Sequence, residues 1–141
     1  MKVVLINHSD SLGGASVVTY RLLKALQAQG IEARMLVVHK ATDDPSVVVA
    51  APHWRARLQF YIEAARIFVA NGHDRGDLFK VSLGSDGLPL SRHPLVREAD
   101  AVLLAWVNQG MLSLKEIGRI AAAKPVIWTM HDMWNLSLIH I

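Results

Sequence analysis

The chain has 141 residues, of which 52% are hydrophobic and 19% charged, a length for one domain and a composition that excludes a disordered chain. It has no cysteine, which excludes a disulfide scaffold and thiolate metal sites, and its net charge of +3 is spread along the chain rather than gathered into a nucleic-acid footprint. The apolar runs fall far short of the roughly 20 residues that cross a bilayer, and the start turns polar too early for a signal peptide, so we expect a cytoplasmic protein.

The first part of the chain predicts a strand, a loop with two glycines, a helix and a second strand. Residues 2–7 hold a short β-branched run that is typical of a buried parallel strand. Turn-forming residues fill the loop over 7–16, and residues 15–29 carry apolar side chains at helical spacing, with Gly30 as the expected stop. Residues 31–38 first alternate between apolar and charged side chains and then become wholly apolar, which predicts the second strand and completes a βαβ unit.

The middle of the chain predicts a long helix between two irregular segments. Residues 41–52 form a connection in which three consecutive valines favour a short strand. Residues 53–70 predict a helix on which five apolar side chains share one face, apart from most of its arginines. These five are Leu58, Tyr61, Ile62, Ala65 and Val69. Residues 81–94 mix glycine, proline and serine and predict an irregular excursion rather than a linker between domains.

The last part of the chain predicts two more strands around a helix. Residues 101–107 read as a buried strand. Ser113 and Glu116 have the spacing of a capping box, in which Ser113 is the N-cap and Glu116 bonds back to its amide. Residues 126–130 follow a Lys-Pro break and predict the next strand. Strands that alternate with helices indicate an α/β fold, a Rossmann-like parallel sheet with flanking helices.

Ligands of such sheets bind at the carboxyl ends of the strands, where three polar loops are expected. In the first loop, Gly13 and Gly14 precede a helix and would leave backbone amides free at its start, an arrangement that holds phosphate. The same glycines also suit a tight turn, and they lack the spacing of a dinucleotide fold and the lysine of a P-loop. Phosphate binding and a plain turn therefore both stay open.

The other two loops carry aromatic, amide and imidazole side chains. Trp106, Asn108 and Gln109 suit a carbohydrate or nucleoside site, or else a packed tryptophan beside amides that cap a turn. His131 could contact a ligand or act as an acid or base, or it could be structural. Asp132 is its neighbour, so we expect the two side chains on opposite sides rather than as a dyad. The histidines show no i, i+4 pair, and we expect no metal site.

The predicted helix over 53–70 also carries a tryptophan and several arginines. These are Trp54, Arg55, Arg57 and Arg66. Such a helix could rest on a membrane surface, although a solvated basic face explains the same residues.

Three segments together resemble the N-terminal domain of bacterial family-4 glycosyltransferases. They are NHSDSLGGAS at 7–16, AWVNQGMLSL at 105–114 and WTMHDMWN at 128–135. The resemblance implies a GT-B fold, and a hexosyltransferase-type enzyme that moves a sugar from a nucleotide-sugar to a cell-surface glycan or lipid-linked acceptor with retention of configuration. It implies no metal and no cofactor besides the donor substrate. It also leaves peripheral contact with the inner membrane open.

The resemblance assigns roles to individual residues. Gly13, Gly14 and Ala15 fall on the glycine loop that approaches the donor diphosphate and helps to shape the acceptor side. His131 matches the histidine that contacts the donor sugar near the reaction centre, and it is the expected catalytic residue. The remaining matches lie on the acceptor side: Asn108, Gln109 and Asp132.

A GT-B enzyme also needs a second domain that holds the nucleotide and supplies a paired-glutamate motif, and 141 residues cannot contain it. We therefore expect residues 1–135 to be an incomplete acceptor-side domain, inactive without the missing C-terminal domain. Residues 136–141 match the translation of a transposase sequencing adapter, so we expect a non-native tail. A non-catalytic glycan-binding or scaffold module stays as the alternative. A nucleotide-dependent Rossmann enzyme is disfavoured, because no acidic residue ends the second predicted strand.

Overall fold

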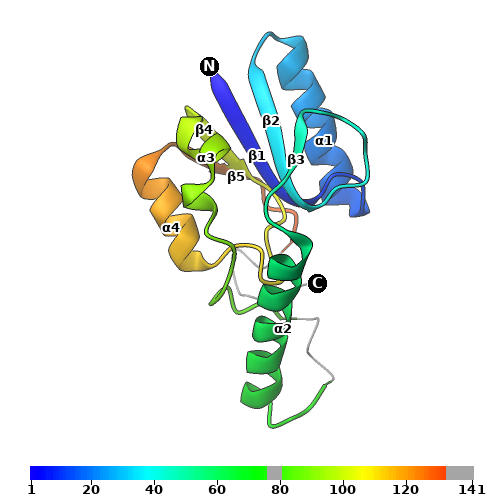
Figure 1. Ribbon diagram of the computed structural model, residues 1–141, viewed down its shortest axis with the longest axis vertical. Helices are drawn as coiled ribbons and strands as arrows, with labels where there is room; N and C mark the ends of the chain where they lie inside the picture. The colour runs from blue at the N-terminus through cyan, green and yellow to red at the C-terminus, as the bar shows by residue number, and fades with distance from the viewer. Residues whose placement is uncertain (76–80, 133–141) are drawn as a thin grey trace.

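The computed structural model describes residues 1–75 and 81–132, and the predicted tail over 136–141 lies outside them. Five strands form one parallel sheet in the order β3-β2-β1-β4-β5 (Figure 1). The elements in chain order are β1 (Lys2–Ser9), α1 (Gly13–Ala28), β2 (Glu32–His39), β3 (Val47–Val49), α2 (His53–Ala70), the short 3-10 helix η1 (Leu90–Arg92), α3 (Pro94–Glu98), β4 (Ala101–Leu104), α4 (Leu114–Ala123) and β5 (Val126–Trp128). The predicted α/β fold with a Rossmann-like parallel sheet is confirmed.

Strand β1 lies in the middle of the sheet and serves two cores. Val3 and Leu5 point to the face that α1 covers, where they pack with Leu23. Val4 and Ile6 point to the opposite face, which α3 and α4 cover (Figure 1). Because successive side chains of a strand point to opposite faces, the short apolar run of β1 fills both layers.

Helix α1 begins earlier than the sequence predicts. Gly13 and Gly14 are its first two residues rather than part of the preceding loop, and Gly13 has a φ of +81° that favours glycine. The predicted stop is confirmed at Gly30, whose φ is +76°. There the amide of Ile31 donates to the carbonyl of Leu26 at 3.1 Å, a contact typical of a glycine-ended helix.

The strands on one side of β1 are shorter than predicted, and two short helices, η1 and α3, were not predicted. β4 ends at Leu104 and β5 at Trp128, where predictions had extended them to residues 107 and 130. Beyond β4 the amide of Trp106 donates to the side chain of Asn7 at 2.8 Å, so a side chain replaces the strand partner. Helix α3 was missed because its N-cap is His93, whose Nδ1 accepts from the amide of Leu95 at 3.2 Å.

Half of the predicted capping box of α4 forms. The Ser113 hydroxyl accepts from the amide of Glu116 at 3.2 Å, as predicted. The carboxylate of Glu116 does not return the bond in the predicted way. It accepts from the amide of Ser91 at 2.8 Å and pairs with Arg119 at 2.9 Å, and it thereby ties α4 to η1.

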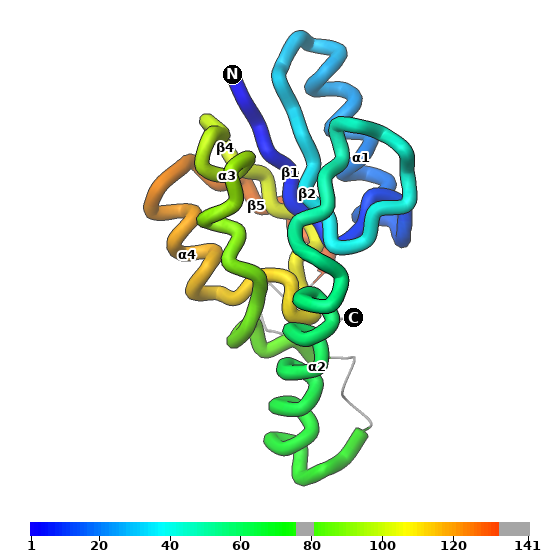
Figure 2. The backbone as a smooth tube through the Cα atoms, in the orientation of Figure 1, coloured from blue at the N-terminus to red at the C-terminus, as the bar shows by residue number. Residues whose placement is uncertain are grey.

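Helix α2 extends beyond the carboxyl ends of the strands (Figure 2). Its five apolar side chains do share a face, but four of them, at positions 58, 61, 65 and 69, are exposed, whereas Ile62 is half-buried. The buried side consists of Ala56, Glu63 and Ile67. An amphipathic surface helix usually turns its apolar stripe to the core, so α2 is inverted relative to that pattern. No helix in the described ranges is both long and apolar enough to cross a bilayer.

Candidate functional site

A pocket of about 370 Å³ opens at the carboxyl edge of the sheet. Its walls are the ends of β1 and β2, the first half of α2 and the loop that follows β4. The polar and aromatic groups that line it are His8, His39, His53, Arg57, Phe60, Tyr61 and Gln109. This is the edge at which open parallel sheets bind their ligands.

Three histidines form a row along the pocket. The rings of His8 and His39 lie 5.1 Å apart, and those of His39 and His53 lie 6.0 Å apart. Burial, and to a lesser degree the charge of His39, lowers the pKa of His8 from 6.5 to about 4, so its ring is neutral at neutral pH. Its buried Nδ1 has no hydrogen-bond partner among the described residues. Those residues also contain no group of three side chains placed to hold a metal ion.

A hydrogen-bonded cluster lies beside the pocket and joins the predicted loops. The amide nitrogen of the Asn7 side chain donates to the Ser16 hydroxyl at 3.0 Å, and its oxygen accepts from the Trp106 backbone. Asp132 accepts from the indole of Trp106 at 2.7 Å and from the side chain of Asn108 at 3.0 Å. The ring of His8 meets Trp106 edge-on at 5.1 Å, so the cluster and the pocket share a wall.

The predicted acceptor-side residues divide between these two features. Asn108 and Asp132 belong to the cluster, as described, whereas Gln109 lines the pocket. Gln109 has a left-handed φ of 55°, and its amide donates to the Ser82 hydroxyl at 3.3 Å. The next residue, Gly110, has a φ of +75°, and a Cβ there would lie 2.8 Å from the backbone carbon of Gln59 in α2. The loop therefore packs its backbone directly on α2.

His131 lies next to the cluster in the chain, and its Nε2 is buried without a hydrogen-bond partner in the described part of the chain. Buried ring nitrogens are normally satisfied in folded proteins. An unsatisfied one at a ligand-binding edge is a suitable contact for a bound polar group. His131 and His8 share this property, although the sequence pointed to His131 alone.

The glycine turn of α1 is open to solvent. Gly13 and Gly14 are exposed, Ala15 is half-buried, and no atom of the described residues lies within 4 Å of a Cβ built on either glycine. The Ser9 hydroxyl accepts from the amides of Ser11 and Leu12, both at 3.2 Å, and these bonds fix the turn that precedes the two glycines. Among the described residues, none therefore covers the two glycines at the start of α1.

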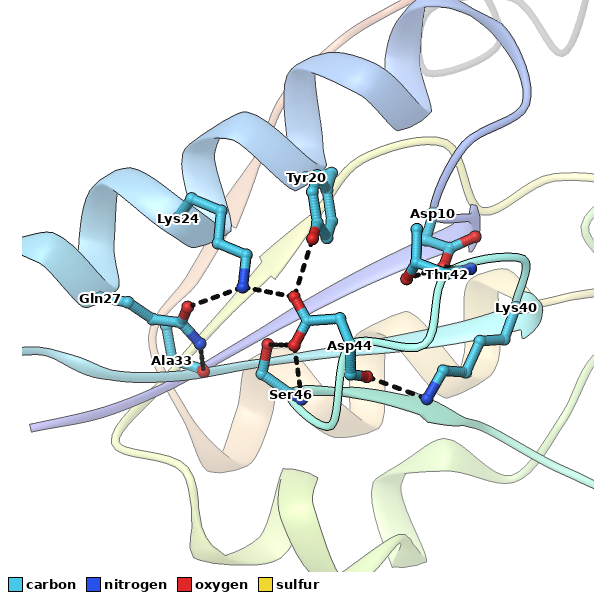
Figure 3. Close-up of polar contacts among 9 residues, drawn as sticks. All are labelled: Asp10, Tyr20, Lys24, Gln27, Ala33, Lys40, Thr42, Asp44 and Ser46. Carbon is cyan, nitrogen blue, oxygen red and sulfur yellow. Dashed lines mark hydrogen bonds and ion pairs between the residues drawn. The ribbon is translucent and has the colours of Figure 1, made fainter.

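A second polar network holds the loop that follows β2 (Figure 3). Asp44 accepts from the Tyr20 hydroxyl at 2.8 Å and from the Ser46 hydroxyl at 2.6 Å, and it pairs with Lys24 of α1. Burial raises the pKa of Asp44, but these bonds outweigh it and hold the pKa well below its usual range. The network fastens the β2–β3 loop to α1.

Asp10 makes a further tie from the glycine loop to the β2–β3 loop (Figure 3). Its carboxylate accepts from the Thr42 hydroxyl at 2.6 Å and from the amides of Ala41 and Thr42, both at 2.9 Å. Burial raises the pKa of Asp10, but the hydrogen bonds from Thr42 and Ala41 outweigh this effect, and the pKa is lowered overall. The turn that carries Gly13 is therefore braced from both sides.

Sequence reasoning missed most of the pocket. His39 and His53 were not singled out, Tyr61 was named only for the apolar face of its helix, and His8 was noted as part of a loop. One signal was available, since His8 and His39 stand at the ends of two strands that were expected to be neighbours. No local pattern shows that α2 returns over those ends.

Comparison with protein-family models, with curated proteins and with solved structures found no match for this chain. The fold and the site together define a Rossmann-like α/β domain with a pocket at the carboxyl edge of its sheet, lined by apolar and aromatic side chains and a few polar groups. Any functional assignment depends on that geometry and on the sequence motifs.

Proposed function

We propose that this chain is the N-terminal, acceptor-side domain of a retaining glycosyltransferase. The enzyme would transfer a sugar from a nucleotide-sugar to a cell-surface glycan or a lipid-linked acceptor. One observation carries the proposal: the three segments that resemble family-4 glycosyltransferases, far apart in the chain, meet in one cluster through Asn7, Trp106 and Asp132. If the three segments lay far apart in the structure, they would not support a common site.

The pocket is suited to an acceptor sugar. Its volume of about 370 Å³ falls within the range of small-ligand sites, and its lining combines aromatic rings with a few polar groups. Tyr61 and Phe60 offer apolar faces to a sugar ring, and Gln109 offers an amide to its hydroxyls. This arrangement supports acceptor binding by Gln109, with Asn108 and Asp132 holding the adjoining wall.

The donor side is assigned to the glycine turn and His131. Backbone amides around Gly13, Gly14 and Ala15 lie at the start of α1, where the helix dipole favours an anion such as the departing diphosphate. His131 would position the donor sugar through its unsatisfied Nε2. In this proposal the domain stabilises charge and positions the substrates, and none of its side chains acts as a covalent nucleophile.

The proposal includes a second domain as a partner. In a GT-B enzyme that domain holds the nucleotide, so we expect no detectable transfer by the 141-residue chain with any nucleotide-sugar. Resequencing the source locus beyond codon 135 from a library made without a transposase tests whether the native frame encodes that second domain. A frame that continues through a second α/β domain with paired glutamates is the expected result, and a frame that ends at codon 141 would refute the proposal.

The pocket also favours one rival function, because aromatic rings and polar groups suited to a sugar lie together in its lining. A glycan-binding module would use it without any donor. Titration with glycans and with nucleotide-sugars, followed by amide NMR shifts, compares the two ligands on the isolated chain and on the longer chain that includes the second domain. The enzyme proposal expects nucleotide-sugar shifts at the Gly13 turn when the second domain is present, whereas a binding module would show glycan shifts and none at that turn.

A further inference from the structure

The exposed face of α2 carries a continuous apolar stripe. We call it the outer stripe, and it consists of Trp54, Leu58, Tyr61, Ala65 and Val69. Four of these side chains are large, with exposed fractions of 61% for Trp54, 48% for Leu58, 55% for Tyr61 and 64% for Val69. Steps of three and four residues keep them on one side of a helix. That side lies opposite the buried Ala56, Glu63 and Ile67.

Positive charge flanks the outer stripe. Arg57 lies on one side of it, and Arg55 and Arg66 lie on the other, by helical spacing. Arg55 stacks on the Trp54 ring at 5.2 Å and Arg57 on the Tyr61 ring at 5.8 Å, so two cations stay close to the apolar surface. Arg66 is paired with Asp86 at 2.9 Å.

The helix has no acidic group on its surface to balance these arginines. Its single acidic residue is Glu63, which is 3% exposed. The Glu63 carboxylate faces inward and accepts from the Ser82 hydroxyl at 2.7 Å and from the amide of Leu83 at 2.8 Å. The inward face thus carries the carboxylate, and the outward face carries the aromatic and basic side chains.

We propose that the outer stripe docks α2 on an anionic lipid bilayer. A helix that lies in the bilayer interface presents an apolar face to the acyl chains and basic groups to the lipid phosphates. Trp54 and Tyr61 have the amphipathic rings that prefer the headgroup level, and Leu58 and Val69 supply the apolar contact. Arg55 and Arg57 lie beside these residues, at the depth of the phosphates.

Charge argues against a second copy of the chain as the occupant. Two α2 helices packed through their outer stripes would place arginines near arginines, and the helix surface has no carboxylate to pair with them. Such like charges oppose association, whereas an anionic bilayer neutralises them. The stripe therefore fits lipid better than it fits itself.

The outer stripe adjoins the pocket, because Arg57 and Tyr61 also line it. A bilayer docked on the stripe would lie at the mouth of the pocket, within reach of a ligand carried by a lipid. The docking itself does not depend on the proposed glycosyltransferase function, and vesicle binding measures it without any transfer reaction.

The test is co-sedimentation of the 141-residue chain with phosphatidylcholine vesicles, made with and without phosphatidylglycerol. We expect binding to the anionic vesicles that weakens as salt is added, and little binding to the neutral ones. Leu58→Glu should reduce anionic binding about tenfold or more. The matched control is Val18→Glu, since Val18 is 51% exposed on α1, and it should bind as the unaltered chain does.

Two further variants separate the contributions. Charge reversal in the double variant Arg55→Glu and Arg57→Glu should remove the preference for anionic vesicles. The unaltered chain should show a blue shift of tryptophan fluorescence when it binds the vesicles, and Trp54→Phe should remove this shift. The proposal is overturned if the unaltered chain ignores anionic vesicles at low salt, or if Val18→Glu weakens binding as much as Leu58→Glu. It is equally overturned if size-exclusion chromatography shows a dimer that Leu58→Glu dissociates while vesicle binding is unchanged.

Discussion

The indole nitrogen of Trp106 donates a 2.7 Å hydrogen bond to the carboxylate of Asp132, which lies 26 positions further along the chain. This contact joins the segments that follow β4 and β5. Because the acceptor is a carboxylate, the bond is stronger than one between neutral groups. It therefore makes a measurable contribution to stability as well as to the shape of the candidate site.

Replacement of this donor is the first prediction. Trp106→Phe keeps most of the ring but removes the N–H, and we expect the free energy of unfolding to fall by about 1–3 kcal/mol. Urea denaturation followed by circular dichroism measures it. The control is Trp54→Phe at an exposed position, where the change should stay within about 0.5 kcal/mol. Equal losses in both variants would contradict the assigned bond.

The second prediction concerns the contact between the loop after β4 and α2. Gly110 and Gly72 both have positive φ, at +75° and +62°. A Cβ on Gly110 would meet the Gln59 backbone, whereas one on Gly72 would meet no described residue within 4 Å. Gly72→Ala should cost about 1–2 kcal/mol from backbone strain alone. Gly110→Ala should cost at least about 1 kcal/mol more, because backbone cannot yield as a side chain does. Thermal unfolding of the two variants compares them, and similar losses would place the loop further from α2.

The third prediction concerns the buried carboxylate of α2. Glu63→Ala leaves the Ser82 hydroxyl and the amides of Leu83 and Gly84 without their acceptor, and we expect a loss of about 2–4 kcal/mol. Because the amide of Gln109 donates to the same Ser82 hydroxyl, NMR shifts should also change at Gln109 in the pocket wall.

Its control is a glutamate on the surface. Glu98 is 61% exposed at its side chain and lies 3.6 Å from the Lys2 ammonium, so Glu98→Ala should change stability by less than about 1 kcal/mol. Chemical denaturation of both variants gives the comparison. If Glu63→Ala were as mild as Glu98→Ala, the loop over 82–84 would not depend on this carboxylate.

The fourth prediction is a pH dependence of stability that arises at His8. Its pKa falls from 6.5 to about 4 on folding, because burial and the charge of His39 disfavour the protonated ring. The unfolded chain therefore takes up a proton below pH 6.5 that the folded chain refuses until about pH 4, and stability falls as the pH is lowered through that window. The free energy of unfolding should fall by at most about 3 kcal/mol over that range.

His8→Gln removes this titration while keeping a polar side chain. Denaturation midpoints measured from pH 7 to pH 4 should then decline less steeply than those of the unaltered chain. His93 is a suitable comparison, since burial also lowers its pKa, and its replacement should leave the His8 contribution in place. An unchanged slope in His8→Gln would show that the ring is not desolvated by folding.

The fold could be predicted largely from local patterns. The β-branched run of β1, the stop at Gly30 and the Ser113 cap each follow from rules that involve a few neighbouring residues. Two of the errors arose where a distant residue replaced a local partner. The carboxylate of Glu116 accepts from the amide of Ser91 instead of the predicted amide of Ser113. The amide of Trp106 donates to the side chain of Asn7 instead of to a strand, and β4 ends early.

The candidate site was less accessible to sequence reasoning. The polar residues at the strand ends could be selected because ligands of parallel sheets bind there. The part of the pocket wall that α2 supplies could not be predicted. The periodicity of that helix shows that Leu58 and Tyr61 share a face, but it does not show which face of the helix is buried. The inward face carries Glu63, whose carboxylate accepts hydrogen bonds from residues 82–84, and no local sequence pattern shows contacts between segments that far apart.

The central position of β1 has a consequence for how the chain is made. Its register with β2 is complete once residue 39 has been synthesised, but its other neighbour, β4, begins at residue 101. At the usual pace of translation the interval of about 60 residues lasts roughly 3–12 s. During that time one edge of the first strand has no partner and the layer beneath Val4 and Ile6 lacks its cover. A nascent chain of this protein therefore passes through a stage in which a ribosome-associated chaperone has a defined apolar strand to hold.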